Sequence, residues 1–255
     1  FVEGVLIPKN KRMTACISSQ VGCSLSCSFC ATGTLGLTRN LSASEIYRQV
    51  VYISKKCMEI YNQPLTNIVF MGMGEPLLNY KNVMRSIHFI TSEEGLNMSY
   101  KRITLSTSGI SKMIRKLADD NVKVNLALSL HAANEELRKK IMPIGKSNTL
   151  EEIRDSLKYY FSKTKKKVTY EYVLLRDVND SIEDAYQLYK YTKHLSSKVN
   201  IIEYNTVEGL EFKKSSFEKT EKFIGYLLKK GVNVSLRRSR GKDINAACGQ
   251  LANKN

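Results

Sequence analysis

The chain has 255 residues and carries 40 Lys and Arg against 24 Asp and Glu, so its formal net charge is +16. With 42% hydrophobic and 25% charged residues it has the composition of a globular protein, which excludes a disordered basic tail and allows one large domain or two small ones. Its apolar runs are shorter than the roughly 18 residues that span a bilayer, and its first residues lack the layout of a signal peptide, so we expect a cytoplasmic protein.

Short β-rich runs alternate with longer segments of helical period along the chain. The predicted strands span residues 14–18, 67–71, 102–106, 124–130, 168–174, 199–204 and 232–236. The predicted helices are 44–60, 80–91, 111–118, 134–141, 150–161, 182–195 and 217–230. This alternation, repeated about six times, predicts an α/β fold built as a full or partial βα barrel rather than an open sheet. Such barrels place their chemistry at the carboxyl ends of the strands, so we expect functional residues just after the predicted strands.

The surplus of positive charge fits a polyanionic partner, because each Lys or Arg that meets a phosphate releases condensed counterions. The polyanionic partner could be RNA, DNA or an anionic membrane. Alternatively, the positive charge only keeps the protein soluble. No basic amphipathic helix with aromatic anchors stands out in the sequence, which disfavours the membrane.

The six cysteines are unevenly spaced, and three of them fall within eight residues as Cys23-x3-Cys27-x2-Cys30. Without a signal peptide a disulfide framework is disfavoured. A structural zinc ion usually has four Cys or His ligands, and the next Cys and His after this group are Cys57 and His88. This spacing disfavours zinc. Three thiolates suit three corners of an iron–sulfur cube, which leaves the fourth iron open to a substrate or cofactor.

This cysteine spacing, just after the first predicted strand, resembles the radical S-adenosylmethionine (SAM) superfamily. The resemblance implies a partial (βα)6-type TIM barrel, a [4Fe-4S] cluster held by the three thiolates, and SAM bound at the open iron and cleaved to a 5′-deoxyadenosyl radical. Phe29 matches the aromatic residue usual between the last two cysteines. The segment Met71-Gly-Met-Gly-Glu75-Pro resembles the superfamily's Gly-rich acidic segment, in which Gly lets backbone approach the ligand and Glu pairs with the SAM ammonium.

Further motifs are similar, over nearly the whole chain, to the adenine C2 RNA methyltransferases of the RlmN family. They lie around Cys16 and in Leu105-Ser-Thr-Ser-Gly109, Ser129-Leu-His131, Asp177-Val-Asn-Asp180 and Arg240-Gly-Lys-Asp-Ile-Asn-Ala-Ala-Cys248-Gly-Gln-Leu251. Related enzymes that methylate adenine C8 typically carry Ala where this chain has Pro76, which favours the C2 branch.

The resemblance implies a role for each isolated cysteine. Cys248 would take a methyl group from one SAM, and the radical from a second SAM would remove hydrogen from that methyl group, so that it adds to adenine C2. Glu3 would take the C2 proton, and Cys16 would then attack the Cys248 sulfur and release the methylated RNA by forming a disulfide. Taken alone, either cysteine is more simply an inert buried thiol, and Cys57 is interpreted as structural.

The resemblance also implies the SAM contacts, which are Gly74, Glu75, Ser106, Ser129, Leu130, His131 and Asn205. For His131 the plain alternative is an ordinary histidine at a strand end, and for Asn205 it is a turn residue.

The implied substrate is an adenosine of 23S ribosomal RNA, and in many family members also the tRNA adenosine beside the anticodon. Turning that base out of its stack costs a few kcal/mol, which phosphate contacts from Arg237, Arg238 and Arg240 could offset. An electron donor such as flavodoxin or ferredoxin is implied, and we expect a monomer. Family members carry a small helical domain before the position of Glu3, and we expect residues 1–255 to form the catalytic barrel with N- and C-terminal extensions, without that domain.

Two alternatives remain open at this point. The chain could be an adenine C8 RNA methyltransferase, or a non-catalytic RNA-binding protein stabilised by a metal.

Overall fold

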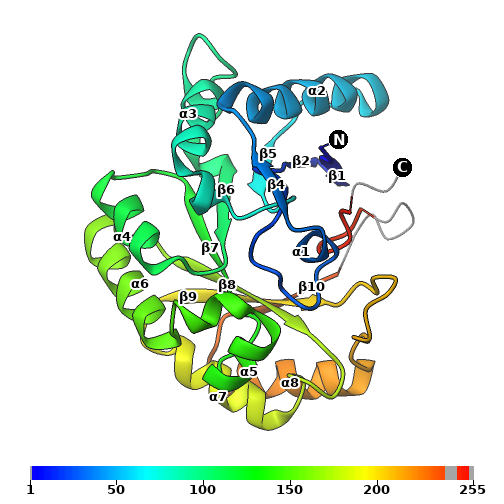
Figure 1. The fold of residues 1–255 in the computed structure, drawn as a ribbon, viewed down its shortest axis with the longest axis vertical. Coiled ribbons are helices and arrows are strands. Elements are labelled where there is room, and N and C mark those ends of the chain that lie inside the picture. The colour runs from blue at the N-terminus through cyan, green and yellow to red at the C-terminus, as the bar shows by residue number, and fades with distance from the viewer. Residues whose placement is uncertain (1, 239–245, 253–255) are drawn as a thin grey trace.

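A curved sheet of mostly parallel strands organises the molecule (Figure 1). The computed structural model describes residues 2–238 and 246–252, and in these residues the main sheet has eight strands in the order β1-β2-β5-β6-β7-β8-β9-β10. Neighbours from β2 to β10 pair in parallel, whereas β1 runs antiparallel to β2. The strands are β1 (Val5–Lys9), β2 (Arg12–Cys16), β5 (Asn67–Phe70), β6 (Ile103–Thr107), β7 (Asn125–Ser129), β8 (Val168–Leu174), β9 (Ser197–Glu203) and β10 (Val234–Arg237).

Helices cover the outer face of this sheet (Figure 1). They are α2 (Ala43–Tyr61), α3 (Tyr80–Thr91), α4 (Ser111–Asp119), α5 (Glu135–Ile141), α6 (Leu150–Thr164), α7 (Ile182–Thr192) and α8 (Phe217–Lys229). Side-chain capping boxes start α2 at Ser42, α6 at Thr149 and α7 at Ser181. Shorter elements are α1 (Ala31–Thr34), the hairpin of β3 (Gln20–Gly22) and β4 (Leu37–Asn40), and the 3-10 turns η1 (Pro76–Asn79), η2 (Tyr100–Arg102) and η3 (Pro143–Lys146).

The two faces of the parallel strands differ in chemistry. On β8, Tyr170 and Tyr172 are buried in the hydrophobic core between sheet and helices. The alternate residues Thr169, Glu171 and Val173 line a cavity on the inner face. Because side chains alternate along a strand, the apolar outer row anchors the helices and leaves the inner row free to carry polar groups. The inside of the sheet is therefore a site rather than a packed core.

The predicted partial barrel is confirmed. Each predicted strand and helix has a counterpart, with ends displaced by a few residues, and the sheet has β1 and β10 at its two edges, so in the described residues the barrel is not closed. Two features were not predicted: the edge strand β1, which contains Pro8, and the short hairpin of β3 and β4 around the cysteine loop. Proline is tolerated in β1 because an edge strand leaves some N–H groups unpaired. None of the described helices is long and apolar enough to cross a membrane.

Candidate active site

A cavity of about 830 Å³ lies inside the curved sheet. Strands from both edges and from the centre of the sheet contribute to its wall, together with the loops that follow them. Cysteines from three separate parts of the sequence line it, namely Cys16, the group Cys23, Cys27 and Cys30, and Cys248. The fold therefore brings five of the six cysteines to one cavity, as the predicted roles require.

The loop that carries Cys23, Cys27 and Cys30 is held by its backbone. The N–H of Cys23 donates to the Gly36 carbonyl at 2.8 Å, and the N–H of Cys30 donates to the Cys27 carbonyl at 3.2 Å. Gly33 is required for this turn, because a Cβ there would lie 2.8 Å from the Cys27 carbonyl oxygen. The three thiols are thus presented to the cavity independently of any metal.

Three cysteine thiols on one loop suit the ligand set of an iron–sulfur cluster. In the described residues, no three Cys, His, Asp or Glu side chains are placed to hold one metal ion. A cubane cluster binds each thiolate through a different iron, so its ligands need not converge on one point. Burial raises the pKa of Cys27 and Cys30, and that of Cys23 to about 11, so the free thiols are protonated at neutral pH and a metal must displace the proton.

Glu75 is the buried acid of the Gly-rich segment, and its side chain is 2% exposed. Its two carboxylate oxygens accept the backbone N–H groups of Leu77 at 3.1 Å and Ser108 at 2.7 Å, and burial raises its pKa. Its own N–H donates to Gln20 Oε1 at 2.8 Å. Gly74 beside it has φ +91°, and a Cβ there would lie 2.5 Å from the Gln20 side chain, so only Gly fits. The carboxylate is thereby fixed at the cavity wall, where it can accept an ammonium group.

His131 is neutral and oriented. Burial is the main cause that lowers the pKa of His131 to about 3. Its Nδ1 accepts the N–H of Val173 at 3.1 Å, so the neutral ring carries its proton on Nε2 and can donate it to a ligand. The ring packs edge-on against Phe29 with centroids 5.1 Å apart. Its backbone is left-handed with φ +56°, a conformation that needs support from its surroundings.

The other predicted SAM contacts divide into two kinds. Ser106 and Ser129 line the cavity on neighbouring strands, with their hydroxyl oxygens 3.2 Å apart. Leu130 is fully buried in the hydrophobic core and, among the described residues, does not line the cavity. Only its backbone could therefore serve a ligand. A role for it as a SAM contact stays a prediction.

Asn205 joins the predicted SAM contacts to the segment that carries Cys248. Its Nδ2 donates to the Cys248 carbonyl at 3.2 Å, whereas its Oδ1 is buried and has no hydrogen-bond partner in the described part of the chain. An orphaned acceptor on a cavity wall fits a ligand that brings a donor, as the adenine of SAM would.

The segment around Cys248 is docked onto the cysteine loop. The N–H of Ala31 donates to the Gly249 carbonyl at 2.8 Å, and the Thr32 hydroxyl donates to the Leu251 carbonyl at 2.6 Å. Ala31 and Thr32 directly follow Cys30. Residues more than 200 positions apart therefore share one local structure, which places Cys248 beside the cluster loop.

Cys16 and Cys248 belong to the same part of the cavity. Cys16 ends β2 and packs in one apolar cluster with Leu251 and Ala246. Burial raises the pKa of Cys16 to about 12, and the charge of Cys248 adds to this rise. Both thiols are free.

Glu3 lies at the edge of this region. Its carbonyl accepts the Ser18 hydroxyl at 2.7 Å, and Val5, two residues later, pairs with Cys16. Glu3 is half-buried and, among the described residues, does not line the cavity. The base role predicted for it stays a prediction.

Two charged cavity residues were not recognised as such from the sequence. Glu171 is a single acid within the buried run of β8, and that isolated charge was the available signal. Arg237, expected as a phosphate contact, instead forms an ion pair with Glu171 inside the cavity, with Nη1 and Oε2 3.6 Å apart. Arg238 is exposed, and Arg240 lies outside the described residues.

The Asp177-Val-Asn-Asp180 turn supports His131. Asn179 is fully buried, and its Nδ2 donates to the carbonyl oxygens of His131 at 2.7 Å and Val173 at 2.8 Å. Its Oδ1 accepts the N–H of Leu175 at 2.7 Å. These three bonds hold the left-handed backbone of His131 against β8.

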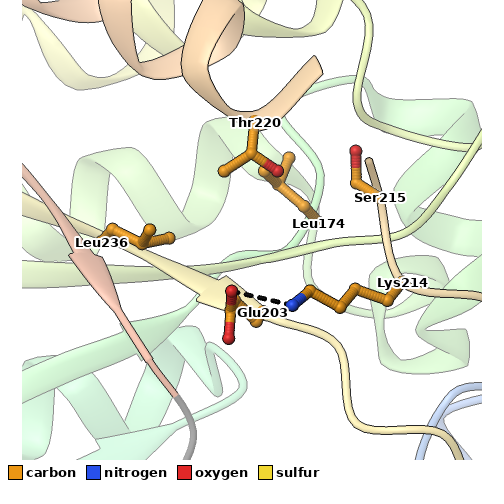
Figure 2. Close-up of a pocket in the computed structure, with 6 residues that line it drawn as sticks. All are labelled: Leu174, Glu203, Lys214, Ser215, Thr220 and Leu236. Atoms are coloured by element: carbon orange, nitrogen blue, oxygen red, sulfur yellow. Dashed lines mark ion pairs between the residues drawn. The ribbon is translucent and has the colours of Figure 1, made fainter. Parts of the chain in front are cut away.

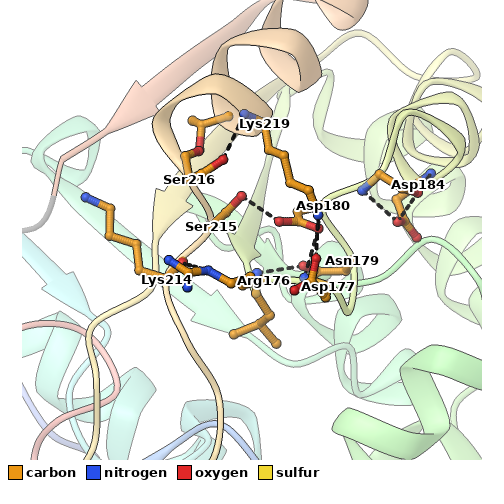
Figure 3. A network of polar contacts seen from close by, with 12 residues as sticks. Arg176, Asp177, Asn179, Asp180, Asp184, Lys214, Ser215, Ser216 and Lys219 are labelled. Carbon is orange, nitrogen blue, oxygen red and sulfur yellow. Dashed lines mark hydrogen bonds and ion pairs between the residues drawn. The ribbon is translucent and has the colours of Figure 1, made fainter.

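The same turn also fastens the loop that follows β9, as Figure 3 shows. Asp180 accepts the Ser215 hydroxyl at 2.6 Å and pairs with Lys219 at 3.3 Å. Figure 2 shows a further contact in this region, the ion pair between Lys214 and Glu203, whose charged atoms are 2.9 Å apart. Because Asn205, the second residue of this loop, bonds the Cys248 carbonyl, the turn links the His131 side of the cavity to the Cys248 side.

Replacing Asn179 by Ala should destabilise the fold. The change removes three buried hydrogen bonds and leaves two carbonyls and one N–H unpaired, so we expect the free energy of unfolding to fall by about 2–4 kcal/mol. Urea denaturation measures this. The exposed Asn233, replaced in the same way, should change stability by no more than about 0.5 kcal/mol. Equal effects of the two substitutions would show that the Asn179 network contributes little.

Comparison with known proteins identifies the family. The model of the radical SAM superfamily matches residues 17–189. Proteins named probable dual-specificity RNA methyltransferase RlmN are similar throughout: that of Christiangramia forsetii is 54% identical over 99% of this chain and 72% of its own length, and that of Flavobacterium psychrophilum is 57% identical over 100% and 73%. A radical SAM methyltransferase from Sphaerobacter thermophilus has the same fold, with a TM-score of 0.96 and 43% identity over 98% of this chain and 73% of that one. The chain therefore belongs to the radical SAM superfamily and, within it, to the RlmN family of dual-specificity RNA methyltransferases.

Proposed function

We propose that this enzyme methylates C2 of an adenosine in 23S ribosomal RNA through a methylated Cys248, with the tRNA adenosine beside the anticodon as a second substrate. The observation that carries the proposal is the docking of the Cys248 segment onto the cysteine loop, in a cavity that Cys16 also lines. The radical SAM family implies a [4Fe-4S] cluster and SAM. Because the chain belongs to a methyltransferase family, we favour an enzyme over the alternative of a non-catalytic RNA-binding protein.

The residues for the two cofactors follow from the cavity wall. Cys23, Cys27 and Cys30 would hold the cluster, and the acid Glu75 would receive the SAM ammonium. The remaining SAM contacts would be Gly74, Ser106, Ser129, Leu130, His131 and Asn205. When bound, the cluster and SAM supply a 5′-deoxyadenosyl radical. Two SAM molecules are consumed per turnover in this proposal, because one methylates Cys248 and the other supplies the radical.

Cys248 and Cys16 carry the transfer itself. Cys248 would accept a methyl group from SAM at its sulfur, with S-adenosylhomocysteine as the leaving group, and the 5′-deoxyadenosyl radical would then take one hydrogen from this methyl group. The carbon radical left on Cys248 would add to adenine C2. Glu3 would take the C2 proton, and the unpaired electron of the adduct would pass to the oxidised cluster. Cys16 then breaks the bond between Cys248 and the methylene group by forming a disulfide. Electron-poor C2 makes this route necessary, since C2 is not nucleophilic enough to attack SAM directly.

Access of RNA to the cavity requires a flipped base. A volume of about 830 Å³ is ample for an adenine beside SAM. The exposed Arg238 adjoins the cavity and is a candidate phosphate contact. We propose that residues 1–255 form the catalytic barrel with N- and C-terminal extensions, that the barrel acts as a monomer in the cytoplasm, and that flavodoxin or ferredoxin supplies electrons.

Nucleoside mass spectrometry tests the proposed product. Protein loaded anaerobically with iron and sulfide, given a reductant and deuterated SAM, should convert unmodified 23S rRNA and tRNA to labelled 2-methyladenosine. The Cys248→Ala variant should give none, and the Cys57→Ala variant should retain activity because Cys57 is buried in α2 away from the cavity. Labelled 8-methyladenosine in place of the C2 product would assign the chain to the C8 reaction instead.

A further inference from the structure

Arg237 is an internal cation near the two isolated cysteines. It ends β10, at the edge of the sheet opposite β1, and its side chain lines the cavity together with Cys16 and Cys248. Its Nη1 lies 3.4 Å from the Met71 sulfur and 3.6 Å from Glu171 Oε2. The guanidinium is thus placed by contacts inside the cavity.

A buried polar row holds Glu171 behind this arginine. Glu171 is 4% exposed, and its Oε1 accepts Asn200 Nδ2 at 2.9 Å. Asn200 Oδ1 in turn accepts the Ser235 hydroxyl at 2.9 Å. The other carboxylate oxygen of Glu171, Oε2, forms the ion pair with Arg237 and has no hydrogen bond among the described residues. Since a buried carboxylate without a counter-charge is costly, Glu171 fixes the position of the guanidinium.

Met71 connects the guanidinium to Cys16. The Met71 side chain contacts Arg237, and its backbone N–H faces the Cys16 sulfur. The groups that act on Cys16 are therefore Cys248 from the docked segment, Arg237 from β10 and the Met71 backbone after β5. Burial and Cys248 raise the pKa of Cys16, whereas Arg237 and the Met71 N–H lower it. Arg237 is thus the one positive side chain among these groups in the described residues.

We propose that Arg237, held by Glu171 and Met71, is a positioning residue that favours the thiolate of Cys16 and so sets the rate at which the covalent protein–RNA adduct is resolved. The inference rests on the proposed function for the identity of that step. A thiolate rather than a thiol is the nucleophile in such exchange, and a neighbouring guanidinium stabilises it.

The step balances without a further reactant. Cys16 loses its proton, and its sulfur attacks the Cys248 sulfur, so that the disulfide forms and the bond from Cys248 to the methylene carbon breaks. The electron pair of that bond stays on the carbon, which takes a proton and becomes the methyl group of the product. The two sulfurs are oxidised by two electrons and the carbon is reduced by two. A dithiol reductant resets the disulfide after release.

The test measures the reactivity of Cys16 without RNA. Cluster-loaded protein is treated anaerobically with methyl methanethiosulfonate between pH 6 and 10, and modification at Cys16 is followed by fragmentation mass spectrometry. Arg237→Gln should slow the reaction about tenfold at each pH, and Glu171→Gln should slow it several-fold because the guanidinium loses the carboxylate that holds it near Cys16. Arg237→Lys should keep most of the wild-type rate. Arg85→Gln, an equal loss of charge on the exposed face of α3, should leave the rate unchanged.

The contrast between Arg237→Lys, which keeps the positive charge, and Arg237→Gln, which removes it, separates electrostatics from packing. If Arg237→Gln matches wild type, or if Arg237→Lys slows the reaction as much as Arg237→Gln does, the proposal is wrong. Circular dichroism establishes that each variant is folded, and Glu171→Gln provides the test if Arg237→Gln is not folded. With RNA present, Arg237→Gln should also prolong the adduct about tenfold. Absence of an adduct in every variant, alongside the expected reactivities, would contradict the proposed function while leaving the role of Arg237 at Cys16 intact.

Discussion

The Cys16→Ala variant is expected to purify with RNA covalently attached through Cys248. Removing Cys16 deletes the nucleophile proposed to break the bond between Cys248 and the methylene group, while the cysteine loop, the proposed SAM contacts and the docking of Cys248 stay in place. Product release should fall by roughly 10³-fold or more, because no other free thiol in the described residues shares the apolar cluster with Cys16 and the Cys248 segment. Denaturing gels with nuclease digestion measure the adduct.

Two controls assign the adduct to its residues. The double variant with Cys16→Ala and Cys248→Ala should carry no RNA, and Cys57→Ala should behave as wild type because it removes a thiol that is fully buried in α2. RNA-free Cys16→Ala protein, prepared with cluster and SAM in a cell that supplies the RNA, would contradict the role proposed for Cys16.

The wild-type adduct should also depend on pH. Because burial raises the pKa of Cys16 to about 12, its thiolate is the minor form at neutral pH, and its fraction rises about tenfold for each pH unit below that value. The adduct lifetime should therefore shorten about tenfold per pH unit between pH 6 and 9. Quenching single turnovers at several pH values measures it. A lifetime independent of pH would show that another step limits release.

The parallel strands and outer helices were predictable because apolar periodicity reports the outer face of the sheet. Val168, Tyr170 and Tyr172 on β8 carry that signal, and it places the strand to the residue. The cysteine loop was equally readable, because its spacing is local. Strand β1 could not be predicted from the sequence. It pairs with β2 at the edge of the sheet through a tight turn, and its five residues are too few to show a periodic pattern.

The inner face could be predicted only where a motif marked it. Glu75 and His131 stand in motifs, whereas Glu171 and Arg237 are single charges whose partners come from other strands. Nothing local in the sequence indicates that β8 and β10 bring these two side chains together, because that contact depends on both strands pairing with β9 in the folded sheet. The same holds for Asn179, whose role at His131 appears only when the turn is folded against β8.

The triple variant with Ala at Cys23, Cys27 and Cys30 should fold but lose the iron–sulfur cluster. The loop is held by backbone bonds, such as Cys23 N–H to the Gly36 carbonyl at 2.8 Å and Ser28 N–H to the Ile141 carbonyl at 3.0 Å, which Ala retains. Without thiolates the irons have no ligands in the cavity wall, so the absorbance near 400 nm after anaerobic reconstitution should fall to about the level of protein without iron.

This variant also distinguishes a cluster from a single ion, because the two differ in the number and kind of metal ions that the cysteine loop binds. Wild-type protein should bind roughly four irons with sulfide and cleave SAM when reduced, whereas the triple variant should do neither. Cys57→Ala is the matched control and should keep the full cluster. Zinc bound in place of iron under anaerobic conditions, with one ion per chain, would contradict the cluster, since the thiols would then have to converge on one point that the described residues do not provide.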